Sequence, residues 1–184
     1  MKKDLSFWQL FGLTFTAVLG TLSHFLYAWT GFLPFALFCA VNESTFEHIK
    51  ILFFPMLLFA ALQSRFFRPW YANFWQIKLF GILLGTALIP VLFYTYTGAF
   101  GAPPDWLNIL FFFIAAGAAY FLESVHFKRS ERCPTIDNAR KTAVNNGISI
   151  GVLLFLAVLF ILFTFLPPRL PIFKDPLSGG YGIL

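Results

Sequence analysis

The chain alternates long apolar stretches with short polar ones. Five of the apolar stretches run for about 20 residues, which is the length a helix needs to cross the hydrocarbon core of a bilayer. The pattern therefore predicts five membrane-spanning helices, at residues 7–27, 44–62, 74–94, 106–127 and 144–166. Because only helices or closed barrels span membranes, we expect an all-α, polytopic membrane protein with a single transmembrane domain over residues 1–184.

A sixth apolar stretch, residues 31–41, is about half as long as a span and carries Pro34 near its start. One interpretation is a re-entrant or interfacial half-helix, because the stretch is too short to cross the bilayer alone. The other interpretation joins it to the second span as one long, tilted helix. The sequence leaves both open.

Composition agrees with a membrane location, because the chain is 59% hydrophobic, has 27 Phe and is only 11% charged. Ten of the 13 Lys and Arg residues fall on the side of the N terminus in this topology: Lys2, Lys3, Arg65, Arg68, Lys78, Lys128, Arg129, Arg132, Arg140 and Lys141. Basic residues accumulate on the cytoplasmic side. We therefore expect a multi-pass protein of the plasma membrane, the bacterial inner membrane, with a cytoplasmic N terminus and an extracytoplasmic C terminus.

The net charge of +5 does not indicate nucleic acid. The basic residues lie in predicted loops beside membrane helices, where anionic lipid headgroups are the expected partners. Gly-x-x-x-Gly patterns at residues 81–85 and 147–151 predict helix faces that approach other helices closely in lipid. They indicate packing inside the bundle, with homo- or hetero-oligomerisation as the alternative. Cys39 and Cys133 form no Cys-x-x-Cys motif, so we predict no disulfide or thiol chemistry.

Ionisable residues gather where the second span begins, in the segment NESTFEHIK at residues 42–50. Part of this segment is explained by helix formation. Ser44 and Glu47 have the spacing of a capping box. Alternatively, Asn42 can cap the helix while Val41 and Phe46 make a hydrophobic staple. Carboxylates are also favoured at the positive end of the helix dipole. Lys50 follows Glu47 by three residues and Glu43 by seven, so it can neutralise one of them.

Helix formation leaves two histidines and one carboxylate unexplained. His24 lies at the outer end of the first span, close to His48 if the two helices are antiparallel neighbours. Imidazole and carboxylate are ligands for zinc or manganese, so we predict His24, Glu47 and His48 as metal ligands, with a divalent metal such as zinc as the candidate cofactor. The predicted ligand-binding residues are His24, Asn42, Glu43, Glu47, His48, Lys50 and Asp175.

Asp175 belongs to a tail, residues 167–184, in which apolar side chains alternate with turn-forming Asp-Pro and Gly-Gly pairs. We expect this tail to fold back over the outer face, with an interfacial tail held by its aromatic residues as the alternative. A secondary inner cluster, Glu123 and His126, has the i, i+3 spacing of di-iron bundles. Only one such copy is present, and Lys128 and Arg129 are ordinary partners for Glu123.

These motifs resemble those of an uncharacterised family of small bacterial multi-pass membrane proteins, classed as a domain of unknown function. The resemblance rests on HFLY at residues 24–27, NESTFEHIK at 42–50, FFP at 53–55 and PIFKDPLSGGYG at 171–182. It covers nearly the whole chain and implies a multi-pass fold, but no activity, substrate or cofactor. Ala40 stands where the family pattern has Pro, which keeps the continuous-helix interpretation open.

Three functions fit the sequence. The principal hypothesis is a small protein that binds or transports a cation, proton or small ligand at the outer Glu/His site, with Glu123 and His126 as an inner station. The second is an outward-facing, metal-dependent enzyme acting on a lipid-linked substrate, with Glu43 as general base on a metal-bound water. The third is a structural subunit of a membrane complex.

Overall fold

The protein is a bundle of five long helices, seen in a computed structural model that describes residues 4–68, 70–130 and 136–183. The elements in chain order are α1 (Leu5–Thr30), η1 (Leu33–Leu37), α2 (Thr45–Phe67), α3 (Phe74–Phe100), α4 (Asp105–Arg129), α5 (Ile136–Phe165) and η2 (Pro171–Phe173), where η marks a 3-10 helix. Four residues used in the sequence analysis lie outside the described residues: Lys2, Lys3, Arg132 and Cys133.

All five α-helices are long and apolar enough to cross a membrane, with Arg140–Phe165 as the spanning part of α5. The described residues contain no β-strand, only an isolated bridge between Lys174 and Tyr181. The predicted all-α fold with five spans is confirmed, and the chain has the architecture of a multi-pass membrane protein. The helices extend beyond the predicted apolar stretches at most of their ends, but α2 begins one residue later than predicted and α5 ends one residue earlier.

Capping residues separate the segment at residues 31–41 from both neighbouring helices. Gly31 ends α1 with a left-handed φ of 59°, and its N–H donates to the Tyr27 carbonyl. Ser44 begins α2, where its hydroxyl accepts the N–H of Glu47 at 3.4 Å. Between them only η1 is helical, and Pro34 lies at its start. The segment is thus a short 3-10 helix followed by a loop, and it is not continuous with α2.

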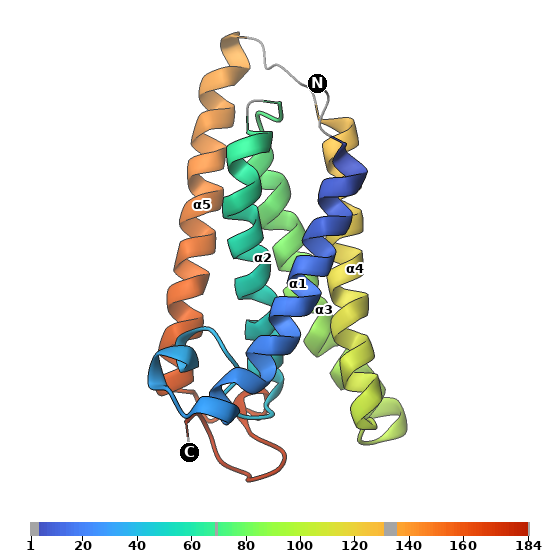
Figure 1. The fold of residues 1–184 in the computed structure, drawn as a ribbon, viewed down its shortest axis with the longest axis vertical. Helices are drawn as coiled ribbons and strands as arrows, with labels where there is room; N and C mark the ends of the chain where they lie inside the picture. The colour runs from blue at the N-terminus through green and yellow to red at the C-terminus, as the bar shows by residue number, and fades with distance from the viewer. Residues whose placement is uncertain (1–3, 69, 131–135, 184) are drawn as a thin grey trace.

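Successive helices run in opposite directions (Figure 1). The start of α1 lies at one end of the bundle, which we call the far end, together with the connection from α2 to α3 and the end of α4. The other end, which we call the tail end, holds η1, the start of α2 and the chain that follows α5. Every residue of the segment NESTFEHIK therefore lies at the tail end, where α1 also finishes.

The core is built around α2. Two thirds of the residues in its most apolar segment are buried, whereas only 17% of those in the corresponding segment of α5 are buried. Close approach of α3 and α4 depends on the first Gly-x-x-x-Gly pattern. A Cβ on Gly81 would lie 2.5 Å from Cγ of Glu123, and one on Gly85 would lie 3.2 Å from Cβ of Ala119. The second pattern is different, because a Cβ on Gly147 or Gly151 would meet no described atom within 4 Å.

Candidate metal centre

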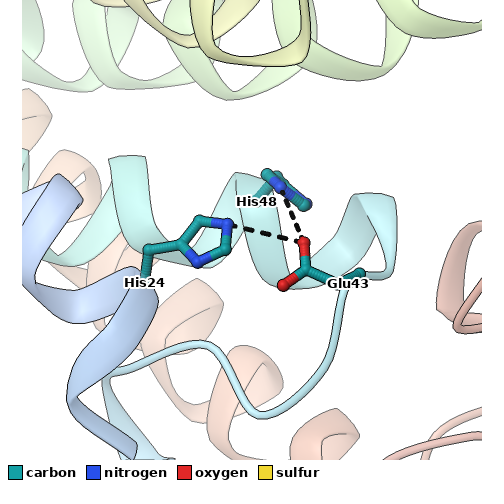
Figure 2. Close-up of side chains that lie close together, drawn as sticks. All are labelled: His24, Glu43 and His48. Carbon is teal, nitrogen blue, oxygen red and sulfur yellow. Dashed lines mark ion pairs between the residues drawn. The ribbon is translucent and has the colours of Figure 1, made fainter. Parts of the chain in front are cut away.

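Two imidazoles from different helices face one carboxylate at the tail end (Figure 2). His24 comes from α1, Glu43 from the loop just before α2, and His48 from the first turns of α2. Oε2 of Glu43 lies 3.5 Å from Nε2 of His24 and 3.7 Å from Nε2 of His48. Each residue offers one ligand atom, and all three atoms lie within 4.8 Å of one another. The side chains are 22%, 42% and 21% exposed, so an ion can reach them from the surface.

The start of α2 orients the His48 ring. Nδ1 of His48 lies 2.9 Å from the carbonyl oxygen of Ser44, one turn earlier. Because a carbonyl only accepts, the proton of the neutral ring is on Nδ1, and the lone pair of Nε2 is directed toward Glu43. A histidine whose second nitrogen donates to a backbone carbonyl is typical of metal ligands.

Hydrogen bonds on both sides of Glu43 fix its loop. The Ala40 N–H donates to the carbonyl of Ser23 at 3.0 Å, which ties the loop to α1 beside His24. The Asn42 side chain accepts the N–H of Ser44 at 2.9 Å and donates to the carbonyl of Gly182 at 2.8 Å. Asn42, predicted as a ligand-binding residue, thus connects the loop, the helix start and the tail, and it supports the position of Glu43.

Glu47 and Lys50 form a separate, buried ion pair. Their charged atoms lie 2.5 Å apart, and their side chains are 1% and 0% exposed. Oε2 of Glu47 also accepts the N–H of Val41 at 3.2 Å. The Lys50 ammonium donates to the carbonyl of Ala36 at 3.0 Å and to the hydroxyl of Thr164 at 2.9 Å. The pair therefore joins α2 to η1, to the loop and to α5.

The carboxylate that faces the imidazoles is not the one that we expected. The sequence analysis assigned Glu47 to the metal and Glu43 to a bound water, but the carboxylate facing both imidazoles is that of Glu43. The reason is the position of the helix start. Ser44 is the N-cap of α2, so Glu43 lies outside the helix and its side chain is not held one turn below Glu47.

The tail packs against the start of α2. The Phe173 ring lies 4.6 Å from that of Phe46, measured between centroids. Both oxygens of Asp175 accept hydrogen bonds within the tail, from the Leu177 N–H at 3.2 Å and from the N–H and hydroxyl of Ser178 at 3.1 and 2.5 Å. Burial acts to raise the pKa of Asp175, but these bonds, with one from the N–H of Glu43, hold that pKa below its ordinary value.

Asp175 is therefore a residue of the tail turn that touches the backbone of Glu43, and its carboxylate is occupied by that turn. Its role in ligand binding stays a prediction.

In the secondary inner cluster, Glu123 pairs with Lys78 and not with His126. Glu123 is buried and accepts a hydrogen bond from the Lys78 ammonium at 2.6 Å, whereas His126 is exposed. The sequence analysis counted Lys78 with the basic residues of the loops, although it lies within the predicted span at residues 74–94. The signal that was missed is its position, since Lys78 follows the first residue of α3, Phe74, by one helical turn and lies inside an apolar stretch.

Comparison with known proteins gives a family but no characterised relative. A family model described as a family of unknown function, DUF6512, matches residues 1–183. No curated protein and no solved structure matches the chain. The match extends over nearly the whole chain, as the sequence motifs implied.

Proposed function

We propose that this chain, which belongs to the DUF6512 family of unknown function, is a membrane protein that binds a divalent metal ion between His24, Glu43 and His48. The observation that carries the proposal is the single Glu43 oxygen facing Nε2 of two histidines from different helices. The donor set, two imidazoles and one carboxylate, is one that zinc accepts, with three protein ligands and one open position.

The spacing of the ligand atoms supports this assignment. Zinc bonds of about 2.0–2.1 Å place the ligand atoms of a tetrahedral site about 3.4 Å apart. The two distances from Glu43 to the histidines are 3.5 and 3.7 Å. The remaining spacing, between the two imidazole nitrogens, is at most 4.8 Å, so a small rotation of the rings completes the site.

The charges near the cluster are compatible with a bound cation. One carboxylate can neutralise one imidazolium, and two imidazolium rings with centroids 5.2 Å apart would repel each other. A divalent ion between two neutral rings and Glu43 needs no second positive ring. The other carboxylate of the segment is already neutralised by Lys50.

The same charges favour binding or transport of the ion over hydrolysis. Hydrolysis by a metal-bound water is commonly assisted by a general base within hydrogen-bond reach. Among the described residues beside the cluster, Glu43 is needed as a ligand, Glu47 is paired with Lys50 and Asp175 accepts hydrogen bonds from its own turn. We therefore propose that the cluster binds a cation. Because ionisable residues in membrane-spanning helices commonly mark ion pathways, we propose that the function of this binding is passage of the ion across the membrane.

We further propose that the tail end faces the outside of a plasma membrane. Apart from the buried Lys50 and Lys78, the described basic residues near the far end are Arg65, Arg68, Lys128, Arg129, Arg140 and Lys141, against Arg169 and Lys174 at the tail end. This asymmetry follows the positive-inside rule, and it gives the far end anionic lipid headgroups as partners. A reporter fused after Leu184 is expected to read as extracytoplasmic, and a cytoplasmic signal would reverse the orientation.

Zinc titration of the chelator-treated protein in detergent tests the proposed function. We expect about one zinc per chain, with affinity at least about tenfold lower in His24→Ala and in His48→Ala, because each variant loses one of three ligands. His126→Ala is the matched control, since this third histidine is exposed and distant in sequence from the cluster. Equal zinc affinity in the wild type and both cluster variants would refute the site.

A further inference from the structure

A second polar cluster lies inside the bundle, and the proposed metal site does not involve it. It consists of one residue from each of four helices, Gln9 of α1, Gln63 of α2, Lys78 of α3 and Glu123 of α4, which we call the polar layer. None of the four is more than 5% exposed. In a membrane-spanning bundle, buried polar groups are costly unless they are paired, and they commonly mark functional sites.

The charged half of the polar layer, Lys78 and Glu123, is paired and neutral overall. The Lys78 ammonium lies 2.6 Å from Oε2 of Glu123. Four aromatic rings also surround the ammonium, with centroids 5.4–5.8 Å away, namely Phe59, Phe74, Tyr120 and Phe127. Such contacts stabilise a cation that is removed from water. The pair therefore needs neither a further cation nor a further anion.

Both amides of the polar layer and one oxygen of Glu123 are not satisfied. Nε2 and Oε1 of Gln9, Nε2 and Oε1 of Gln63, and Oε1 of Glu123 make no hydrogen bond to any described residue. The Gln9 amide lies beside the Glu123 carboxylate and interacts with it, although neither Nε2 of Gln9 nor Oε1 of Glu123 has a partner in hydrogen-bond geometry. Nearly all buried side-chain amides in proteins have partners, so five such atoms in one region indicate a ligand.

Gln63 belongs to the same region as the ion pair. It lies one helical turn from Phe59 on one side and from Phe67 on the other, on one face of α2. The Phe59 ring borders the Lys78 ammonium at 5.4 Å. The Phe67 ring lies 5.9 Å from that of Phe127, which also borders the ammonium. Gln63 therefore stands between two rings that frame the Lys78–Glu123 pair.

We propose that the polar layer is an internal water-binding site that hydrates the Lys78–Glu123 pair. The unsatisfied atoms comprise two NH2 groups, which need acceptors, and three oxygens, which need donors. Water supplies both, and it is uncharged like the ion pair as a whole. A metal cation would satisfy only the oxygens, and an anion only the NH2 groups, while each would add charge to a neutral layer. Buried waters with two to four polar partners are ordinary parts of protein structures.

Radiolytic hydroxyl labelling read by mass spectrometry tests this proposal in the full-length protein in detergent, because water bound beside a buried ring promotes its oxidation. Phe59 is the reporter, and Phe53 is its matched control. Both are buried rings of α2, 1% and 0% exposed, but Phe53 packs against Phe54 and Phe160 in the apolar core. We expect Phe59 to be labelled at least about fivefold faster than Phe53, since Phe59 borders the atoms of the polar layer that lack partners and Phe53 packs against other rings.

A variant that lacks the two unsatisfied amides gives a second test of the proposal. The double variant Gln9→Leu, Gln63→Leu should lower Phe59 labelling to the rate of Phe53. Equal labelling of the two rings in the wild type overturns the proposal, as does fast Phe59 labelling that persists in the folded double variant. Suppression of Phe59 labelling by millimolar sodium or potassium would also overturn it, because a cation would then occupy the layer. If the double variant does not fold, the wild-type comparison decides alone.

Discussion

Replacing Lys50 by Met tests the role of the buried Glu47–Lys50 pair, which holds the loop of the metal centre in place. Met fills a similar volume without charge, so the substitution leaves the Glu47 carboxylate unpaired at 1% exposure. It also removes the donor to the Ala36 carbonyl and to the Thr164 hydroxyl. Losing one partner of a buried pair costs about 3–5 kcal/mol, because the remaining charge stays out of water without compensation.

The double variant Glu47→Gln, Lys50→Met separates the charge effect from a packing effect. The Gln oxygen still accepts the Val41 N–H, as Glu47 does at 3.2 Å, and no charge remains buried. We expect this variant to lose only about 1–3 kcal/mol, the cost of an unsatisfied amide N–H group. The double variant should therefore be more stable than Lys50→Met alone.

Thermal unfolding in detergent, followed by circular dichroism, measures the difference. For a chain of this length about 1 kcal/mol shifts Tm by roughly 2–4 °C, so Lys50→Met should lower Tm by roughly 6–20 °C. A Tm within about 2 °C of the wild type would show that the pair is not buried as described. A double variant no more stable than the single one would show that packing, and not an uncompensated charge, explains the loss.

Two further predictions follow from the fold and the tail. Gly81→Ala places a Cβ 2.5 Å from Cγ of Glu123, whereas the Cβ of Gly147→Ala meets no described atom within 4 Å. We expect Gly81→Ala to lower the free energy of unfolding by about 1–3 kcal/mol, and Gly147→Ala to leave Tm unchanged or slightly raised. Equal effects of the two substitutions would contradict the α3–α4 contact. Because the pKa of Asp175 lies below its ordinary value, its contribution to tail docking should be complete above about pH 4 and lost as the pH falls through the folded pKa. Proteolysis of the tail should accelerate over that range, and Asp175→Asn should abolish the pH dependence; a tail cut equally fast at all pH values would contradict the docking.

The fold was predictable because spanning helices obey simple rules of length and polarity. Five apolar stretches gave five helices, and the cap at Ser44 could be read from its spacing to Glu47. Helical spacing allowed Lys50 two partners, Glu47 and Glu43. What decided between them was the start of α2 at Thr45, because Glu43 then leaves the helix and lies free to face His24.

The contacts between distant parts of the chain could not be predicted in the same way. Lys78 and Glu123 are 45 positions apart and belong to different helices, so no local spacing connects them. Their pairing depends on the rotation of α3 against α4, which Gly81 permits by leaving room for the carboxylate. Likewise, the bond from Asn42 to Gly182 joins positions 140 residues apart, and it exists only because the tail returns to the start of α2.

Zinc K-edge X-ray absorption of the one-to-one zinc complex tests the metal centre most directly, because it reports the ligands themselves. The account predicts two imidazole nitrogens and one carboxylate oxygen at about 2.0–2.1 Å, with one imidazole lost in His48→Ala and the carboxylate lost in Glu43→Gln but kept in Glu47→Gln. A spectrum with no imidazole ligand, or one that changes in Glu47→Gln and not in Glu43→Gln, would contradict the assignment of the metal to His24, Glu43 and His48.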